Sequence, residues 1–380
     1  MNVLITGGAG FIGSRLAASL LEKGDTVRIL DNFSEQIHSR AELSDDLAGK
    51  VEVIKADVRD RNAMREALKG IESLVHLAAE TGTGQSMYEI ERYFSVNVQG
   101  TAMLLDLMQN EDCASELRSV IVASSRAIYG EGAYQCQVHG AVFPEQRVRA
   151  HLEQGQFEPV CPTCSASVSL LPTMETAPFQ PMSMYGLTKQ VQEQAVLLFA
   201  RTRGINGFGL RYQNVYGPGQ SLKNPYTGIL AVFSNLARQN QPIEIYEDGL
   251  ESRDFVYIDD VVDATVRSIH HTEPFVGALN VGSGVATSVR TVADEIKAFF
   301  ESESPIRVSG AFRVGDIRHN IADVQSAKEV LGFSARTSFK QGLNNFLNWA
   351  SQQDAQDKEA YLRSVNELAS RGLMGITANK

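Results

Sequence analysis

The chain has 380 residues, of which 43% are hydrophobic and 21% charged, a balance typical of a soluble globular protein. Its 45 acidic and 35 basic residues give a net charge of −10, which argues against a nucleic-acid partner. We expect a cytoplasmic protein without a membrane partner, because no apolar run approaches the roughly 18 residues of a membrane span, no secretory leader precedes the first strand, and four cysteines make no disulfide framework.

The first predicted elements meet at a run of glycines. Residues 2–6 form an apolar strand that leads directly into Gly7, Gly10 and Gly13, and a helix with Phe11 and Ile12 in its first turn follows. Glycines let the backbone turn sharply and let a pyrophosphate approach the amide groups at a helix N-terminus. The same glycines would also suit an ordinary loop, so the run alone does not decide between the two.

The second predicted strand, residues 26–31, ends in Asp31. This carboxylate follows Gly13 by 18 residues, close to the roughly 20 expected for a group that binds an adenosine ribose. A carboxylate there would repel a 2′-phosphate, so the spacing favours NAD over NADP. The alternative is that Asp31 is a turn residue at a strand end.

Further strands alternate with helices along the first half of the chain. Strands are predicted at 51–58, 73–79, 119–125 and 207–212, and helices at 61–69, 88–110 and 185–203. This alternation predicts a Rossmann-type doubly wound parallel sheet with helices on both faces. Ligands bind at the carboxyl ends of such strands, where Gly7, Asp31, Asp57, Ala78 and Ser125 fall.

The second half of the chain has a different pattern. Helices are predicted at 228–238, 259–270, 289–302, 324–331 and 336–350, and strands at 243–246, 253–257 and 277–281. We therefore predict an NAD-binding domain at residues 1–212, with an insertion at 131–182. Residues 213–350 are predicted to form mainly a smaller α+β substrate-binding lobe, and residues 351–380 a C-terminal helical tail.

Tyr185 and Lys189 are spaced i, i+4, which places both side chains on one face of the predicted helix. A tyrosine with its ordinary pKa near ~10 is too weak an acid to act as a base at neutral pH. One positive charge about 4 Å away is worth ~4 kcal/mol at an effective dielectric near 20, so Lys189 could lower that pKa. Tyr185 is then a candidate base for a sugar hydroxyl, with Ser125 binding the same oxygen.

Several motifs together resemble those of the extended short-chain dehydrogenase/reductase family, and in particular its nucleotide-sugar epimerases and dehydratases. They are Thr6-Gly7-x-x-Gly10-x-x-Gly13, Asp31-Asn32, Asp57-Val58, Leu77-Ala-Ala79, Ser125-Arg-Ala-Ile-Tyr129-Gly130, Tyr185-x-x-x-Lys189, Arg211-Tyr-Gln-Asn214, Arg253-Asp254 and Arg313-Val-Gly-Asp316. The resemblance covers roughly residues 1–130 and 183–350. It implies a tightly bound NAD, a nucleotide-diphosphate sugar as substrate, and a homodimer formed through helices 88–110 and 185–203.

The resemblance also implies roles for individual residues. The catalytic residues would be Ser125, Tyr185 and Lys189, and the substrate contacts Ser125, Asn214, Arg253, Arg313 and Asp316. NAD would lie against Gly7, Gly10, Phe11, Ile12, Asp31, Asn32, Asp57, Val58, Leu77, Ala78, Ala79, Asn97, Tyr185 and Lys189. Arg253 and Arg313 could instead be partners in surface ion pairs.

The expected reaction is epimerisation at carbon 4 through a transient 4-keto sugar. Dehydratases of the family carry an Asp-Glu pair after the strand-end hydroxyl, where this chain has Arg126 and Ala127, so dehydration is not expected. Residues 80–90 and 213–228 are similar to the branch that acts on dTDP-6-deoxyhexoses such as dTDP-L-rhamnose, although Gln213 replaces an aromatic residue common in other epimerases. The alternatives are an NAD(P)H-dependent 4-keto-sugar reductase and a non-catalytic dinucleotide-binding protein.

The insertion contains two short pairs of metal-binding residues, Cys136-Gln-Val-His139 and Cys161-Pro-Thr-Cys164. Two such pairs separated by a loop match a tetrahedral Cys₃His zinc site. A segment with little apolar content would also need a metal to fold. The alternative is three reduced cysteines and a solvent-exposed histidine. Any zinc is expected to be structural, and Cys113 to be incidental.

Overall fold

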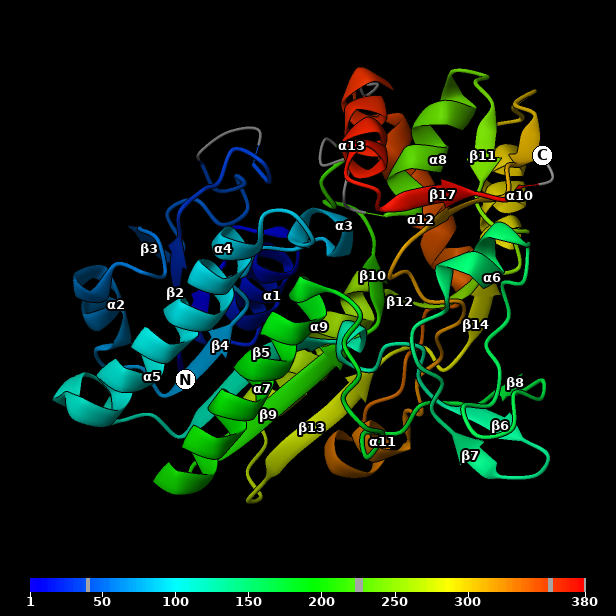
Figure 1. The fold of residues 1–380 in the computed structure, drawn as a ribbon. Helices are drawn as coiled ribbons and strands as arrows, with labels where there is room; N and C mark the ends of the chain where they lie inside the picture. The colour runs from blue at the N-terminus through cyan, green and yellow to red at the C-terminus, as the bar shows by residue number, and fades with distance from the viewer. Residues whose placement is uncertain (39–41, 223–227, 355–357, 379–380) are drawn as a thin grey trace.

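The fold is taken from a computed structural model, which describes residues 1–38, 42–222, 228–354 and 358–378 (Figure 1). Seven parallel strands form the main sheet in the order β13-β9-β5-β4-β1-β2-β3, which confirms the predicted doubly wound α/β class. The strand order reverses between β1 and β4, and ligands bind at such a switch point. The strands are β1 (Asn2–Thr6), β2 (Thr26–Asp31), β3 (Glu52–Lys55), β4 (Ser73–His76), β5 (Ser119–Ser125), β9 (Asn206–Tyr212) and β13 (Val276–Val281).

Alternate residues of each strand pack on opposite faces of the sheet. Val3 and Ile5 belong to one buried cluster and Leu4 to another, so both faces are apolar and need a cover. Helices α1 (Phe11–Glu22), α9 (Ile258–Ile269) and α11 (Gln325–Leu331) cover the first face, and α2 (Arg61–Leu68), α5 (Gly100–Asn110) and α7 (Met184–Arg203) the second.

The long helix predicted at 88–110 is interrupted. It consists of α4 (Ile90–Tyr93), a π-helical stretch η1 (Phe94–Gln99) and α5. A π-helical turn accommodates an extra residue and is frequent at functional sites. Three further short helices, α3 (Thr83–Ser86), η2 (Asp112–Ala114) and η3 (Arg126–Ile128), lie in connections, and η2 contains Cys113.

The second lobe, as we call the elements beside the carboxyl edge of the sheet, contains three small sheets. Their strands are β10 (Asn214–Tyr216), β12 (Ser252–Tyr257) and β14 (Ala286–Ser288), then β11 (Ile243–Ile245) with β15 (Ile306–Val308), and β16 (Ala311–Arg313) with β17 (Met374–Ile376). The helices are α8 (Ile229–Arg238), α10 (Val289–Phe299), α12 (Phe339–Ser351) and α13 (Lys358–Ser370).

The chain crosses between the two parts more than once. Strand β13 completes the main sheet by pairing with β9, and α9 and α11 cover that sheet, although all three come from the range 213–350. The predicted boundary at residue 212 therefore does not divide the chain into two continuous domains. A single strand of six residues carries no signal of which sheet it joins.

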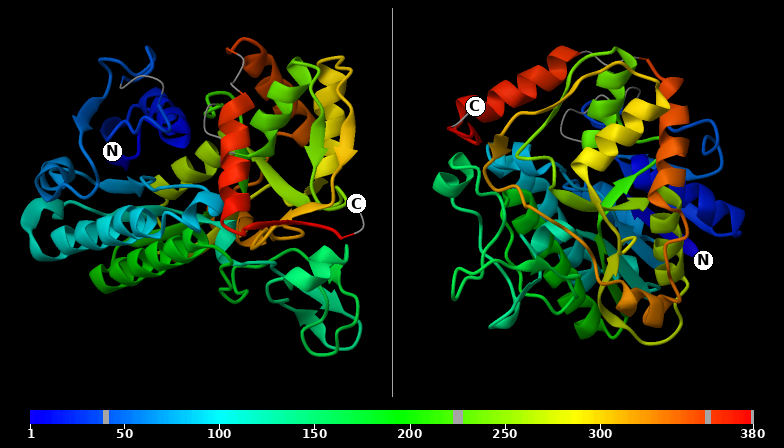
Figure 2. Two further views of the ribbon diagram at one scale, coloured as in Figure 1. Left: turned by 45° about the horizontal axis from the view of Figure 1, so that its top comes forward. Right: turned by 90° about the vertical axis from the view of Figure 1, so that its right-hand side faces the viewer.

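The insertion and the tail both contain strands that local patterns did not predict. Residues 131–182 form a three-stranded antiparallel sheet of β6 (Tyr134–Cys136), β7 (Gly140–Val142) and β8 (Ser169–Leu170), with α6 (Arg149–Glu153) between β7 and β8 in the chain. The predicted helical tail includes α13 but ends in β17, which pairs with β16; residues 355–357 and 379–380 of the tail lie outside the described residues. Strands of two or three residues are too short to show a period. Figure 2 shows the insertion as a small unit beside the second lobe.

Among the described residues, no helix is both long and apolar enough to cross a bilayer.

A buried ion pair fixes α7 against the sheet. Arg211 of β9 donates two hydrogen bonds to Glu193 of α7, at 2.6 and 2.9 Å, and both side chains are almost fully buried. The same guanidinium donates to the Tyr129 hydroxyl and to the Glu175 carbonyl. Because α7 carries Tyr185 and Lys189, this pair sets the position of both side chains relative to the strand ends.

We predict that Arg211→Met lowers the free energy of unfolding by about 3–5 kcal/mol, because it leaves the Glu193 carboxylate buried without its partner. Urea unfolding followed by circular dichroism measures the change. The matched control is Arg203→Met on the exposed end of α7, which should cost less than about 1 kcal/mol. Equal losses in the two variants would contradict the role given to the pair.

Candidate active site

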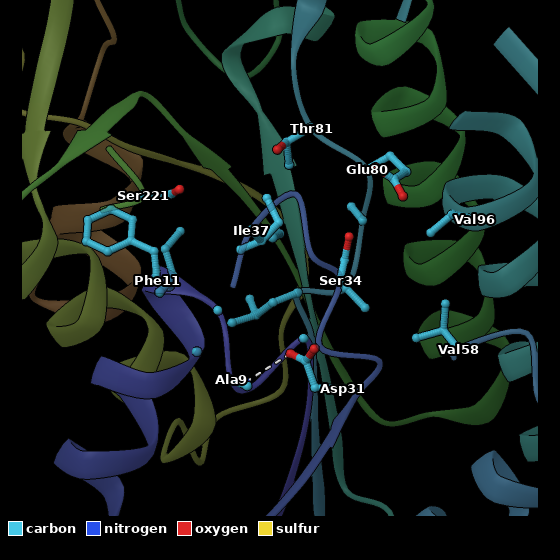
Figure 3. A pocket seen from close by; sticks show the side chains of 18 of the residues that line it. Ala9, Phe11, Asp31, Ser34, Ile37, Val58, Glu80, Thr81, Val96 and Ser221 are labelled. Carbon is cyan, nitrogen blue, oxygen red and sulfur yellow. Dashed lines mark hydrogen bonds between the residues drawn. The ribbon is translucent and has the colours of Figure 1, made fainter. Parts of the chain in front are cut away.

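A cavity of about 410 Å³ opens at the switch point between β1 and β4 (Figure 3). It is bounded by the loops that follow β1, β2, β4 and β5 and by the start of α7. All but one of the predicted cofactor residues line it, namely Gly7, Gly10, Phe11, Ile12, Asp31, Asn32, Asp57, Val58, Leu77, Ala78, Ala79, Tyr185 and Lys189. Strand ends that are far apart in the sequence therefore meet as the strand pattern predicted.

The glycine loop is packed too closely for side chains. Gly7 has φ +70°, and a Cβ atom there would lie 2.8 Å from the backbone nitrogen of Ala78. A Cβ atom at Gly13 would lie 2.5 Å from the Gly7 carbonyl oxygen. Helix α1 begins at this loop, with Gly10 as its N-cap and no side-chain hydrogen bond capping it. This cradle fits a pyrophosphate.

Asp31 ties the first two loops together. It is buried, and its carboxylate accepts hydrogen bonds from the backbone N–H groups of Ala9 at 3.0 Å and Phe33 at 2.8 Å (Figure 3). Beside it, Asn32 donates to Asp57 at 3.1 Å. Hydrogen bonding from Arg59 lowers the pKa of Asp57 to about 2, so the Asp57 carboxylate accepts hydrogen bonds at neutral pH. Carboxylates at this edge fit the hydroxyls of an adenosine ribose.

Asn97 is the one predicted cofactor residue that does not line the cavity. Its side chain is fully buried in the π-helical stretch η1. It accepts a hydrogen bond from the Glu80 backbone N–H and donates to the Glu80 carbonyl and to the Thr188 hydroxyl. The structure therefore places Asn97 as a positioning residue that ties the loop after β4 to α7.

The three predicted catalytic residues lie together in the lining of this cavity. Ser125 is the last residue of β5, and Tyr185 and Lys189 lie on the first two turns of α7. The N-cap residue Ser183 accepts a hydrogen bond from Gly186, which fixes the start of that helix. Lys189 donates to the Ala123 carbonyl at 3.0 Å and lies 6.0 Å from the centre of the Tyr185 ring.

Burial has the largest effect on the pKa values of both Tyr185 and Lys189. It raises the pKa of Tyr185, while the neighbouring Ser125 hydroxyl and the Arg126 guanidinium act in the opposite direction. Burial also lowers the pKa of Lys189 to about 7. The predicted lowering of the Tyr185 pKa by Lys189 is therefore opposed by desolvation, and a tyrosinate needs a further positive charge nearby.

A second cavity of about 370 Å³ continues from the first into the second lobe. Four predicted substrate residues, Asn214, Arg253, Arg313 and Asp316, line it. Tyr185 lines both cavities, as do Thr81 and Val215. A ligand that occupies the second cavity would therefore meet the first at the Tyr185 hydroxyl.

Arg253 is buried and points to this second cavity, which disagrees with its alternative interpretation as a surface ion-pair partner. Its guanidinium donates to the Asp316 carboxylate at 3.0 Å and to the carbonyls of Ile317 and Arg318. Burial alone would raise the pKa of Asp316, but the surrounding guanidinium groups, Arg253 first, lower it. Arg313 lies with its guanidinium 5.1 Å from the centre of the Tyr246 ring.

Arg126 and Leu368 are among the residues of the second cavity that the sequence interpretation missed. From the sequence, we used Arg126 only to show that the dehydratase Asp-Glu pair is missing. In the structure it lines the cavity and donates a hydrogen bond to the Asn214 side chain at 3.1 Å. Burial lowers the pKa of Arg126 to about 10. Its place directly after Ser125 was the available signal. Leu368 belongs to a tail for which we predicted no chemistry, and no local pattern indicated that it lines this cavity. Residues 223–227, in one of the stretches that resemble the dTDP-sugar branch, lie outside the described residues.

The four predicted metal ligands also lie together, away from both cavities. The ligand atoms of Cys136, His139, Cys161 and Cys164 lie within 4.8 Å of one another. Cys113 is elsewhere, in η2.

Comparison with known proteins gives consistent matches. The sequence profile of the NAD dependent epimerase/dehydratase family matches residues 3–146 and 164–282. A dTDP-L-rhamnose 4-epimerase from Burkholderia thailandensis is 41% identical over 356 residues, which cover 93% of this chain and 95% of that protein.

Solved structures match over the same extent. The protein MoeE5 in complex with UDP-glucuronic acid and NAD has a TM-score of 0.73 at 30% identity, covering 93% of this chain and 99% of its own. The UDP-glucose 4-epimerase of Thermotoga maritima with UDP-glucose has the same TM-score of 0.73 at 28% identity, with the same 93% and 99% coverage.

We predict that Gly7→Ala loses most of its bound dinucleotide, because the added methyl group meets the Ala78 backbone. Gly24→Ala is the matched control, since Gly24 also has positive φ, at +83°, but has no neighbouring atom within 4 Å of a Cβ. Both variants carry about 1–2 kcal/mol of backbone strain, and only Gly7→Ala should lose dinucleotide. Dinucleotide released on acid denaturation, measured per chain, checks this; a full complement in Gly7→Ala would contradict it.

Proposed function

Because the chain belongs to the NAD dependent epimerase/dehydratase family, we propose that it is a nucleotide-sugar 4-epimerase. It would invert carbon 4 of a hexose through a transient 4-keto sugar while one NAD stays bound. The observation that carries the proposal is the position of Tyr185, which lines both the cavity suited to a dinucleotide and the cavity suited to a second ligand.

Three side chains would manage the proton of the 4-hydroxyl. Tyr185 would accept this proton and return it, and Ser125 would bind the same sugar oxygen. Bound NAD supplies the hydride acceptor and donor at carbon 4, and its oxidised ring brings the additional positive charge that the buried Tyr185 requires. Lys189 lies against the Tyr185 ring and bonds to Ala123, a position from which it can also bind the nicotinamide ribose.

The second cavity would hold the nucleotide diphosphate while the sugar turns. Arg126, Arg253 and Arg313 line it, with the Asp316 carboxylate among them, and Glu244, Glu247 and Glu251 also belong to the lining. Glu247 is paired with Arg147 and Arg318, and the three lining guanidinium groups suit a diphosphate, which can accept bidentate hydrogen bonds. An anchored diphosphate leaves the sugar free to present its other face, as inversion at carbon 4 requires.

We further propose a dTDP-linked 6-deoxyhexose, such as dTDP-L-rhamnose, as substrate. The Burkholderia thailandensis relative supports this choice. The cavity adds a physical reason, because Leu368 of α13 packs against Gly84 in its lining. An apolar side chain there suits the methyl group of a 6-deoxy sugar better than a hydroxymethyl group.

The proposal also includes a homodimer, a cytoplasmic location and a structural zinc ion. A homodimer through α5 and α7 is supported by their packing side by side (Figure 1) and by the exposed Leu198 on α7. A cytoplasmic location is supported by four unpaired cysteines. A zinc ion in the insertion would be structural, because exchange of a hydride at carbon 4 with NAD needs no Lewis acid.

We expect Tyr185→Phe to lower turnover by about 10²–10⁴-fold, because the base is lost, while bound NAD is retained. The matched control is Tyr257→Phe, which removes a buried hydroxyl outside the lining of both cavities and should keep turnover near the unmodified level. Turnover is measured as C4 epimer formed, together with the dinucleotide content of each variant. Undiminished turnover in Tyr185→Phe would refute the role of this residue.

The proposed reaction predicts inversion without added cofactor. The protein is incubated with dTDP-L-rhamnose, UDP-glucose and UDP-glucuronic acid, and the sugars are separated by chromatography. We expect the C4 epimer of dTDP-L-rhamnose to accumulate to equilibrium. Consumption of added NAD(P)H in proportion to a 4-keto substrate would indicate the reductase instead, and binding without turnover a non-catalytic protein.

A further inference from the structure

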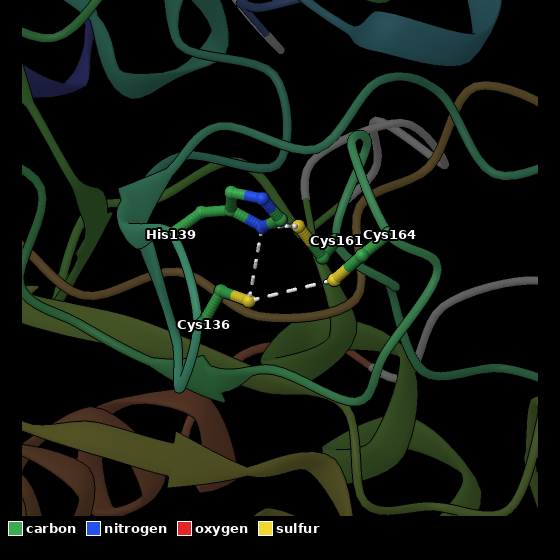
Figure 4. Close-up of side chains that lie close together, drawn as sticks. All are labelled: Cys136, His139, Cys161 and Cys164. Atoms are coloured by element: carbon green, nitrogen blue, oxygen red, sulfur yellow. Dashed lines mark hydrogen bonds between the residues drawn. The ribbon is translucent and has the colours of Figure 1, made fainter.

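The insertion brings three cysteines and one histidine into a compact cluster (Figure 4). The sulfur of Cys136 lies 3.8 Å from that of Cys164 and 3.7 Å from Nδ1 of His139, and the sulfur of Cys161 lies 3.4 Å from the same nitrogen. Figure 4 shows the four side chains pointing toward a common centre. All four cysteines of the chain are unpaired, so no disulfide explains the arrangement.

These separations match the edges of a metal tetrahedron. Zinc binds sulfur at about 2.3 Å and nitrogen at about 2.0–2.1 Å, so a tetrahedral ion holds two sulfurs about 3.8 Å apart and a sulfur and a nitrogen about 3.6 Å apart. The measured sulfur–sulfur separation is 3.8 Å, and the two sulfur–nitrogen separations, 3.4 and 3.7 Å, lie on either side of the expected value.

The two ligand pairs are also built alike. Backbone N–H groups two and three residues further on point at the first sulfur of each pair, from Val138 and His139 to Cys136 and from Thr163 and Cys164 to Cys161. The residue after each pair then has positive φ, Gly140 at 71° and Ser165 at 57°. A left-handed conformation is unfavourable for serine, so Ser165 indicates that the turn serves its ligands.

The small sheet of the insertion has few apolar contacts around it. Its buried cluster consists of Tyr134, Cys136, Val142 and Cys161, with Val168 and Leu170 packed against it, while Leu152, Phe157 and Ala177 of the insertion belong to clusters shared with the rest of the protein. Two of the four buried members are therefore cysteines. A unit with so small a core needs an additional constraint such as a metal.

The ends of the β6–β7 hairpin are bonded to residues at and beside the second cavity. Glu131 precedes β6 and Arg147 follows β7, and the two form a buried ion pair at 3.0 Å. Arg147 also pairs with Glu247 at 2.8 Å and donates to the Asp316 carbonyl at 2.9 Å. Glu131 accepts from the Arg318 backbone N–H. Both hairpin ends are therefore bonded to residues 316–318, which also bind Arg253.

We propose that Cys136, His139, Cys161 and Cys164 bind one structural Zn²⁺, and that this ion holds the hairpin whose Glu131 and Arg147 position the Asp316–Arg253 pair. Binding would release the thiol protons to solvent. Among the described residues that line either cavity, none lies in 131–182, so the ion acts through these ion pairs and not by contact with substrate. Only the kinetic consequence rests on the proposed function.

The metal itself is tested first, in protein purified without chelators. Elemental analysis should find close to one zinc ion per chain, and Cys164→Ser should lose most of it. Cys113→Ser is the matched control and should keep its zinc. In this control Cys164, although exposed, should resist a thiol reagent until a chelator is added. Zinc well below one ion per chain, another metal in its place, or immediate reaction of Cys164 would overturn the proposal.

The coupling is tested with the same variants. In Cys164→Ser, KM for the nucleotide sugar should rise about 2- to 30-fold with a smaller change in kcat and an unchanged NAD content. The Cys113→Ser variant should match the unmodified enzyme. An unchanged KM in a zinc-free, folded variant would overturn the coupling. If the chain lacks epimerase activity altogether, the dissociation constant for the nucleotide sugar replaces KM, so failure of the proposed function and failure of the metal site remain distinguishable.

Discussion

The close approach of the Gly7 backbone to Ala78 is the contact on which the site depends. It brings the loop after β1 against the end of β4 at the point where the strand order reverses, with less space than one methyl group requires. Since Asp31 binds the Ala9 amide in the same loop, the end of β2 is held in the same arrangement. The cavity for a dinucleotide thus follows from backbone packing, and the side chains of the lining only decide which dinucleotide fits.

Whereas backbone packing forms the first cavity, charged side chains determine the properties of the second. Burial lowers the pKa of Arg126, and repulsion from the neighbouring Arg253 guanidinium lowers it further. The Asp316 carboxylate partly neutralises these guanidinium groups. Arg147, which forms ion pairs with Glu131 and Glu247, donates a hydrogen bond to the Asp316 carbonyl and so fixes its backbone. The proposed diphosphate would accept hydrogen bonds from these guanidinium groups, which are already held at the lining of the cavity.

Local patterns in the sequence predicted the parts of the molecule that local physics determines. The apolar strands, the glycine turn, the strand-end carboxylate of Asp31 and the Tyr185–Lys189 spacing all depend on residues close together in the chain. Arg253 and Arg313, which the family resemblance indicated as substrate contacts, both line the second cavity. Contacts between distant segments were missed. The bond from Arg147 to Asp316 spans 169 residues, and strand β17 has only three residues with which to indicate its partner β16. Neither leaves a periodic signal.

The contacts that the sequence did not predict join segments that we had assigned to separate domains. The tail contacts the NAD-binding domain at two points: the Glu367 carboxylate accepts a hydrogen bond from the Tyr88 hydroxyl, and Leu368 packs against Gly84. The tail also contacts the insertion, because Arg149 donates a hydrogen bond to the Gly372 carbonyl. Strand β17 pairs Met374 with Arg313, a residue of the second cavity. The insertion and the tail therefore contact each other beside the second cavity, and the tail contributes Leu368 to its lining. A site assembled in this way can change its substrate through peripheral segments, because the backbone contact at Gly7 and the cofactor cavity do not depend on them.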